Sequence, residues 1–260
     1  KDNVSYNGYL NDMFHWNNGP YVVTDMSQMF ENAKYWRPLN QWGGGGMKSV
    51  DNVSRMFAGS SDFNQDIKPW FNNVSKAWKV KNMSGMFDGN TKFNKSIDDW
   101  WVGNVEDMSS MFKDNTGYNQ SLNNIFKTEP DSGFKIKNME SMFEGNTKFN
   151  NKLGDWKMHT VTSTKNMFKN SVFDKWIINW FKDDNDEKNL QIKDMSGMFA
   201  GSSAMFGSTT QNNPINNWNT KSVENMSGIF KDNTHFDKWV AGWSTESLLS
   251  WDGFKNNNDW

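Results

Sequence analysis

The chain has 260 residues, a formal net charge of −2 at pH 7 and no cysteine. A charge this close to neutral argues against nucleic acid or an anionic membrane surface as the main partner, and the lack of cysteine excludes a disulfide framework. Apolar residues make up only 35% of the chain, so the core is expected to depend on its 20 Phe and 15 Trp side chains.

The first predicted element is an N-terminal cap over residues 1–20. It contains Leu10-Asn-Asp-Met13-Phe14, an incomplete copy of a Met-Phe motif that recurs through the rest of the chain. This copy lies too close to Phe30 to be a full repeat. Stacked repeats need such a cap, because their first core face is otherwise exposed.

A repeat built around Met-Phe fills residues 21–243. Its clearest copy, Val80 to Trp100, reads VKNMSGMFDGNTKFNKSIDDW, and the motif occurs eight times with one Ile-Phe, its Phe at positions 30, 57, 87, 112, 143, 168, 199 and 230. Spacings of 25 to 31 residues between these Phe are typical of a stacked-repeat protein. We therefore expect one domain over residues 1–260, with about eight coils and a C-terminal cap over residues 244–260.

The first half of each repeat predicts a short capped helix, because Val80, Met83 and Met86 share one helical face. The residue before the inner Met position is always of an N-cap type: Asp25, Asn52, Asn82, Asp107, Asn138, Ser163, Asp194 and Asn225. Two residues after each Phe come only Gly, Asn and Asp, which tolerate the left-handed conformation that ends a helix: Asn32, Gly59, Gly89, Asp114, Gly145, Asn170, Gly201 and Asp232.

The second half, Phe93-Asn94, Ile97 and Trp100 in the clearest copy, predicts a short strand with inward-facing anchors. Strand, turn and helix in each unit predict an α/β repeat: a right-handed solenoid with a parallel sheet of short strands and one short helix per coil. The Asn after the aromatic residue is expected to stack into a ladder that satisfies turn backbone groups, at Asn64, Asn94, Asn119 and Asn150.

Insertions account for the longer repeats and are expected to bulge from one edge of the stack, at Phe71–Lys79, Phe126–Phe134, Phe181–Asn189 and Ala204–Asn213. Two loops have compositions that also occur in ligand sites: a run of glycines and a run of acidic residues. The run Gly43–Gly46 lacks the Lys-Ser/Thr of a phosphate-binding loop, and residues 182–188 lack the ligand spacing of a calcium loop. Both are interpreted as solvated loops.

The string Asn-Met-Ser-Gly-Met-Phe-x-Gly, followed by Phe-Asn-x-x-Ile-x-x-Trp, resembles the surface repeats of mycoplasma lipoproteins. These are related to the BspA-like, leucine-rich-repeat-like repeats of about 25 residues in bacterial surface proteins. The resemblance covers Val22 to Trp243. It implies a leucine-rich-repeat-like solenoid on a bacterial cell surface, with adhesion or host interaction as its role and no catalytic residues to carry over.

No constellation of residues predicts catalysis. The three histidines, His15, His159 and His235, lie in different repeats without partners at metal spacing, and the Met-Phe pairs are interpreted as core rather than a soft-metal site. No nucleophile, base and orienting group recur together. We therefore expect no enzyme activity, no metal and no cofactor.

Residues that flank each anchor are the candidate partner surface: Pro38/Asn40, Asp66/Lys68, Ser96/Asp98, Ser121/Asn123, Lys152/Gly154, Trp176/Ile178, Pro214/Asn216 and Trp239/Ala241. Most are polar, but strand alternation turns Trp176, Ile178 and Trp239 away from the core. Trp176 and Trp239 follow Phe-Asp-Lys in two copies, and stacking two coils apart predicts about 10 Å between them. The alternative is that insertions cover them. The predicted binding residues are Trp176, Ile178, Trp239, Asp66, Lys68, Asp98, Asn123 and Asn216.

These patterns favour a non-enzymatic, surface-displayed adhesion module that binds a host or extracellular protein or glycan. The alternatives are a structural surface coat that self-associates, and a carbohydrate-binding module that uses exposed Trp. No apolar run is long enough to span a membrane. We therefore expect an extracellular location with a lipid anchor outside these 260 residues, and no nucleic-acid partner.

Overall fold

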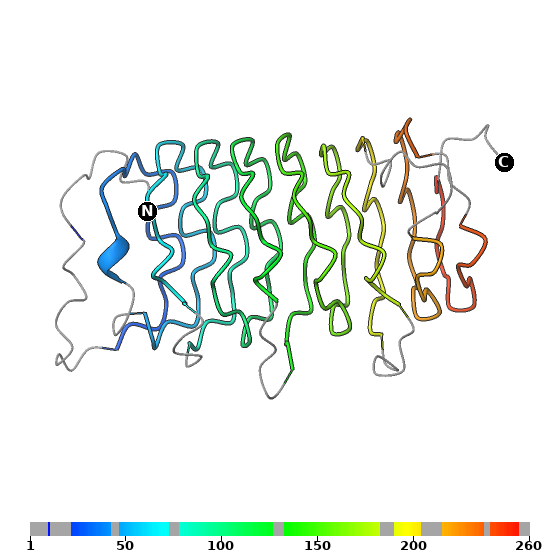
Figure 1. Cartoon of the computed structure of the whole chain (residues 1–260), viewed down its shortest axis with the longest axis horizontal. Helices are drawn as coiled ribbons and strands as arrows, with labels where there is room; N and C mark the ends of the chain where they lie inside the picture. Colours follow the sequence, from blue (N-terminus) through cyan, green and yellow to red (C-terminus); the bar gives the residue numbers. More distant parts are fainter. Residues whose placement is uncertain are drawn as a thin grey trace.

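The computed structural model describes residues 10, 22–42, 47–72, 78–126, 133–182, 190–203, 215–236 and 240–254. In these residues the chain winds through coils that lie side by side, in sequence order from one end of an elongated molecule to the other (Figure 1). Isolated parallel bridges join each coil to the next at one position, through Asp25, Asn52, Asn82, Asp107, Asn138, Ser163, Asp194, Asn225 and Ser250.

The regular structure within the coils differs from the prediction. The only helix in the described residues is the 3-10 helix η1 (Asn40–Trp42), and the pairing between coils consists of single bridges rather than strands. The segment around each Met-Phe is a run of turns instead of a helix. The parallel bridges also lie at the predicted helix N-cap, not at the anchors where strands were expected.

Hydrogen bonding explains why this segment is not helical. The N–H groups of Met83, Gly85 and Phe87 donate to the next coil, to the carbonyls of Asp107 (2.9 Å), Ser109 (2.7 Å) and Met111 (3.0 Å). The N–H groups of Met86 and Asp88 close turns three residues back, to Met83 at 3.3 Å and to Gly85 at 3.1 Å. An α-helix capped at Asn82 would bond the N–H of Phe87 to the carbonyl of Met83, so this N–H could not serve the neighbouring coil.

The predicted capping chemistry is present in another form. In the eight bridging residues from Asp25 to Asn225, the side-chain oxygen accepts the N–H two residues later, for example from Ser84 to Asn82 at 2.9 Å and from Ser196 to Asp194 at 2.7 Å. This is an Asx-turn, the alternative that Asn, Asp and Ser side chains offer to a helix.

Left-handed backbone recurs twice in each coil. The predicted position, two residues after Phe, is confirmed in all eight copies, with φ between +51° at Asp114 and +68° at Gly145. A second position, two residues after the inner Met position, was not predicted: Gln28, Arg55, Gly85, Ser110, Ser141, Asn166, Gly197 and Gly228 have φ between +53° and +62°. Each left-handed residue reverses the local twist and thereby prevents a helix from continuing.

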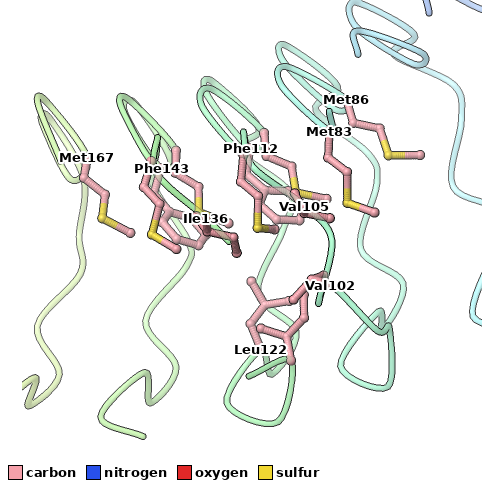
Figure 2. Close-up of a cluster of buried hydrophobic side chains, with 14 of the residues drawn as sticks. Met83, Met86, Val102, Val105, Phe112, Leu122, Ile136, Phe143 and Met167 are labelled. Carbon is pink, nitrogen blue, oxygen red and sulfur yellow. The ribbon is translucent and has the colours of Figure 1, made fainter. Parts of the chain in front are cut away.

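Methionine and phenylalanine form the core, as predicted. Met86 and Phe87 have no exposed surface. Successive Phe rings stack through the molecule, with centroids 5.8 Å apart between Phe57 and Phe87 and 5.6 Å apart between Phe87 and Phe112. Figure 2 shows the Met and Phe side chains of neighbouring coils extending into one apolar interior, with Val102 and Leu122 further along the coil.

Tryptophan connects the second halves of the coils. The buried indole N–H of Trp180 donates to the carbonyl of Leu153, the anchor of the preceding coil, at 2.8 Å. The same bond recurs at Trp70–Leu39, Trp100–Ile67, Trp156–Leu122, Trp218–Ile177 and Trp243–Ile215. Trp42 donates likewise to Leu10 in the predicted N-terminal cap at 2.7 Å. These bonds take the place of a backbone ladder in this half of the coil.

The predicted asparagine ladder is confirmed. The N–H of Asn94 donates to Oδ1 of Asn64 in the preceding coil at 3.0 Å, and the pattern continues from Asn119 to Asn94, from Asn150 to Asn119 and from Asp174 to Asn150.

The buried rings of Phe71, Phe126 and Phe181 lie at the start of three insertions and make edge contacts with Trp100, Trp156 and Trp218. Most of each insertion, Gly43–Gly46 and residues 183–188 of the acidic loop lie outside the described residues.

Candidate functional site

The predicted binding residues differ in how much of their surface is exposed. The predicted exposure of Trp176 is confirmed, with 52% of its surface accessible, and Asp66 and Lys68 are also exposed. Asp98, Asn123, Ile178 and Asn216 are half-buried. Trp239 lies outside the described residues, so its pairing with Trp176 stays a prediction.

Asp66 and Lys68 are already paired within the protein. The N–H of Lys68 donates to Oδ1 of Asp66 at 2.9 Å, and its ammonium lies 2.8 Å from Oδ2 of Asp99 in the next coil. The hydrogen bond to Asp99 raises the pKa of Lys68. These two residues therefore join coils and have little capacity left for a partner.

The half-buried polar candidates also bridge neighbouring coils. Asp98 accepts hydrogen bonds from the hydroxyl of Ser121 at 3.0 Å and from the N–H and side-chain amide of Asn124, both at 2.8 Å. The amide of Asn123 donates to Asp155 at 2.7 Å, and Oδ1 of Asn216 accepts the N–H of Gly242 at 3.0 Å. The structure therefore does not bring the predicted polar residues together into one cluster.

A surface depression of about 450 Å³ lies on three neighbouring coils. Its lining consists of amides, a hydroxyl and two ammonium groups: Ser121, Asn123, Asn124, Asn150, Asn151, Lys152 and Lys175. Of these, Ser121, Asn123 and Lys152 belong to the predicted partner surface, and Asn123 is also one of the predicted binding residues. Its Oδ1 is buried and has no hydrogen-bond donor within the described part of the chain.

Trp176 is not one of the lining residues but is next to one of them in the chain. It directly follows Lys175, and it holds the same place in its coil as Lys152 and Ser121 hold in the two preceding coils. The carbonyl oxygen of Trp176 lies against Gly154, where an added Cβ would be 3.2 Å from it. The exposed Trp176 therefore continues the row of repeat positions that Ser121 and Lys152 contribute to the lining.

The depression has two ammonium groups without acidic partners. Neither Lys152 nor Lys175 forms an ion pair with any described residue, whereas Lys68, Lys92 and Lys193 each lie within 2.8 Å of a carboxylate. The lining itself contains no carboxylate. Three carboxylates lie next to it: Asp98 and Asp155 accept hydrogen bonds from lining residues, and the N–H of Asp174 donates to the lining residue Asn150.

A profile of the family described as Mycoplasma protein of unknown function, DUF285, matches residues 5–80, 75–180, 132–205 and 181–256. The chain belongs to this family. The four overlapping matches agree with a chain made of repeats. No curated protein and no solved structure matches the sequence.

Metal sites, membrane spans and exposed apolar side chains also bear on function. Among the described residues, no group of three or more His, Asp or Glu side chains could hold a metal ion, and no helix is long and apolar enough to cross a membrane. Other exposed apolar side chains lie toward the ends of the stack: Val22, Trp36, Leu249 and Trp251.

Sequence reasoning missed most of the depression because it considered only the positions directly beside each anchor. Asn151 and Lys175 lie one residue further away, two residues after Phe149 and Phe173. The sequence does carry a signal for the depression, because the residue types at two repeat positions change from coil to coil. The first position changes from Gln120 to Asn151 to Lys175, and the next one changes from Ser121 to Lys152 to Trp176.

Proposed function

We propose that this chain is a non-enzymatic binding module displayed on a mycoplasma cell surface, where it recognises a host or extracellular macromolecule. A lipid anchor outside these 260 residues would attach it to the membrane. The observation that carries the proposal is Trp176, which is 52% exposed although the repeating Trp at the end of its own coil, Trp180, is fully buried. Large exposed aromatic residues are frequent anchors of binding energy.

The same proposal assigns the stack to the right-handed, leucine-rich-repeat-like solenoids of BspA-like surface proteins. It is supported by the parallel bridges between successive coils and by the short, repeated unit. Repeat stacks of this kind present extended surfaces to their partners.

Binding of the labelled protein to a basement-membrane extract tests the proposal. We expect saturable binding by the wild type and a loss of at least about 2 kcal/mol in binding free energy, roughly 30-fold in Kd, for Trp176→Ala. Trp36→Ala is the matched control, because Trp36 is 51% exposed in another coil. Equal effects of the two substitutions, or a large fall in the melting temperature of Trp176→Ala, would contradict the assignment of Trp176.

A structural coat formed by self-association is the second candidate, and the C-terminal end of the described stack favours it. Leu249 and Trp251 are 82% and 64% exposed there. The N–H groups of Met226 and Gly228 donate to Ser250 and Asp252 of the last coil. The equivalent N–H groups of that coil, on Trp251 and Gly253, have no acceptor among the described residues.

A further inference from the structure

We propose that the depression beside Trp176 binds an anionic glycan. This inference rests on the proposed function and gives the binding module a ligand class. In the proposed complex a sugar ring packs on the indole of Trp176, its hydroxyl groups bond to the lining amides, and its carboxylate or sulfate group pairs with Lys152 and Lys175.

The composition of the lining favours a saccharide over a protein partner. The buried centre of a protein interface is apolar and depleted in charge, whereas this hollow is lined by four asparagines, a serine and two lysines. Asparagine amides both donate and accept hydrogen bonds, which matches the hydroxyl groups of a sugar. The volume of about 450 Å³ lies within the ~300–1,000 Å³ range of small-ligand pockets.

The aromatic margin supplies the apolar contact that a sugar ring needs. A pyranose ring has one face of C–H groups and a periphery of hydroxyl groups, so it packs against an exposed aromatic ring while its edges remain hydrogen-bonded. Trp176 is the one exposed Trp beside the hollow in the described residues; Trp36 and Trp251 belong to the first and last described coils.

The charges select an anionic saccharide over a neutral one. Lys152 is exposed, Lys175 is half-buried, and neither ammonium is paired with a described carboxylate. The lining contains these two lysines and no carboxylate, and the neighbouring Asp98 and Asp155 are hydrogen-bonded to Ser121 and Asn124 and to Asn123. Two free ammonium groups in one hollow attract a carboxylate or sulfate, and this attraction weakens as salt is added.

Titration calorimetry with three purified saccharides tests the inference: a heparin-derived hexasaccharide, 3′-sialyllactose and lactose. We expect binding of one or both anionic saccharides at low salt, with an affinity that falls at least tenfold between 50 and 500 mM NaCl. Heparin alone indicates a sulfated ligand, and sialyllactose alone indicates a terminal sialic acid. Equal binding of lactose would overturn the role assigned to the lysines.

Substitutions in the lining locate the site. We expect the double variant Lys152→Gln/Lys175→Gln to lose at least tenfold in affinity and most of its salt dependence, and Trp176→Ala to lose at least tenfold. Lys48→Gln/Lys221→Gln is the matched control, because it removes the same charge from exposed lysines in other coils. An equal loss in this control would show that the saccharide follows net charge rather than the hollow, and would overturn the proposal.

The same proteins separate this inference from the proposed function. If no saccharide binds but the protein still binds the basement-membrane extract in a Trp176-dependent way, the glycan inference fails and the binding module stands. If neither binds, both fail.

Discussion

At the scale of single residues, the coil depends on backbone conformations that most side chains avoid. Each described coil has left-handed residues at two positions, and the sequence places Gly, Asn or Asp at only one of them consistently. At the other position lie residues such as Arg55, Ser110 and Ser141. A left-handed residue with a Cβ costs about 1–2 kcal/mol. A Gly substitution at these positions can therefore raise the free energy of unfolding.

Replacing Ser110 with Gly is therefore expected to stabilise the protein. The left-handed cost is removed, and the greater freedom of Gly in the unfolded chain offsets only about 0.5–1 kcal/mol of the gain. We expect a net increase of about 0.5–1 kcal/mol in the free energy of unfolding, measured by urea titration. Ser110 has φ of +54°, and its hydroxyl makes no hydrogen bond with the described residues.

Ser109→Gly provides the control for this prediction. Ser109 is the adjacent residue and is half-buried like Ser110, but its φ is not positive. Only the entropic cost of Gly applies there, so we expect a loss of about 0.5–1 kcal/mol. A loss of stability in both variants would show that Ser110 is not strained in the folded protein.

At the scale of the element, the sequence predicts the repeat and its core but not the secondary structure. Val80, Met83, Met86 and Phe87 point inward from a helix, and they also point inward from successive turns. The deciding feature is the left-handed conformation at Gly85, which interrupts a helix at its centre. In the other coils this position holds several residue types, so single-sequence patterns carry little signal for it.

The candidate site was predictable only in part, for a related reason. The exposure of Trp176 follows from its place beside the anchor Ile177. The depression depends instead on which side chains neighbouring coils place beside one another, and its lining residues are up to 54 positions apart, from Ser121 to Lys175. Their alignment is set by the inter-coil bonds, such as the one from Asp174 to Asn150 at 2.8 Å.

Indole bonds between coils lead to a prediction for the core. Trp180→Phe removes the indole bond to the carbonyl of Leu153, which keeps the N–H of Trp156 as its second donor at 3.1 Å, so the lost bond itself costs about 0.5–1.5 kcal/mol before any loss of packing. We expect a loss of about 2–4 kcal/mol in the free energy of unfolding, because the smaller ring also leaves a cavity. Trp176→Phe, at an exposed position four residues away, is expected to change stability by less than about 0.5 kcal/mol. Similar effects of the two substitutions would contradict a structural role for the indole bond.

At the scale of the whole molecule, each coil completes the hydrogen bonding of the coil before it. Charged contacts join a coil to both of its neighbours. The guanidinium of Arg55 lies 2.8 Å from Oε1 of Glu31 in the preceding coil and 3.0 Å from Oδ2 of Asp88 in the following one. Exposed ion pairs contribute only about 0–1 kcal/mol each, so the stack is held mainly by aromatic packing and backbone bonds. Among the described residues, the N–H groups of Trp251 and Gly253 in the last coil have no acceptor, so this interface is incomplete there.

This incomplete interface gives the last prediction. If the described C-terminal end associates with another copy, the weight-average sedimentation coefficient of the wild type should rise with concentration. The contact would cover the exposed side chains of Leu249 and Trp251 and the N–H groups of Trp251 and Gly253, which have no acceptor among the described residues. Trp251→Lys places a charge in that contact and should keep the protein monomeric. Trp176→Lys is the matched control and should assemble like the wild type, because Trp176 lies on the side of the stack. A wild type that stays monomeric at high concentration would rule out this coat and leave the binding module as the supported function, whereas equal loss of assembly in both variants would move the contact away from the C-terminal end.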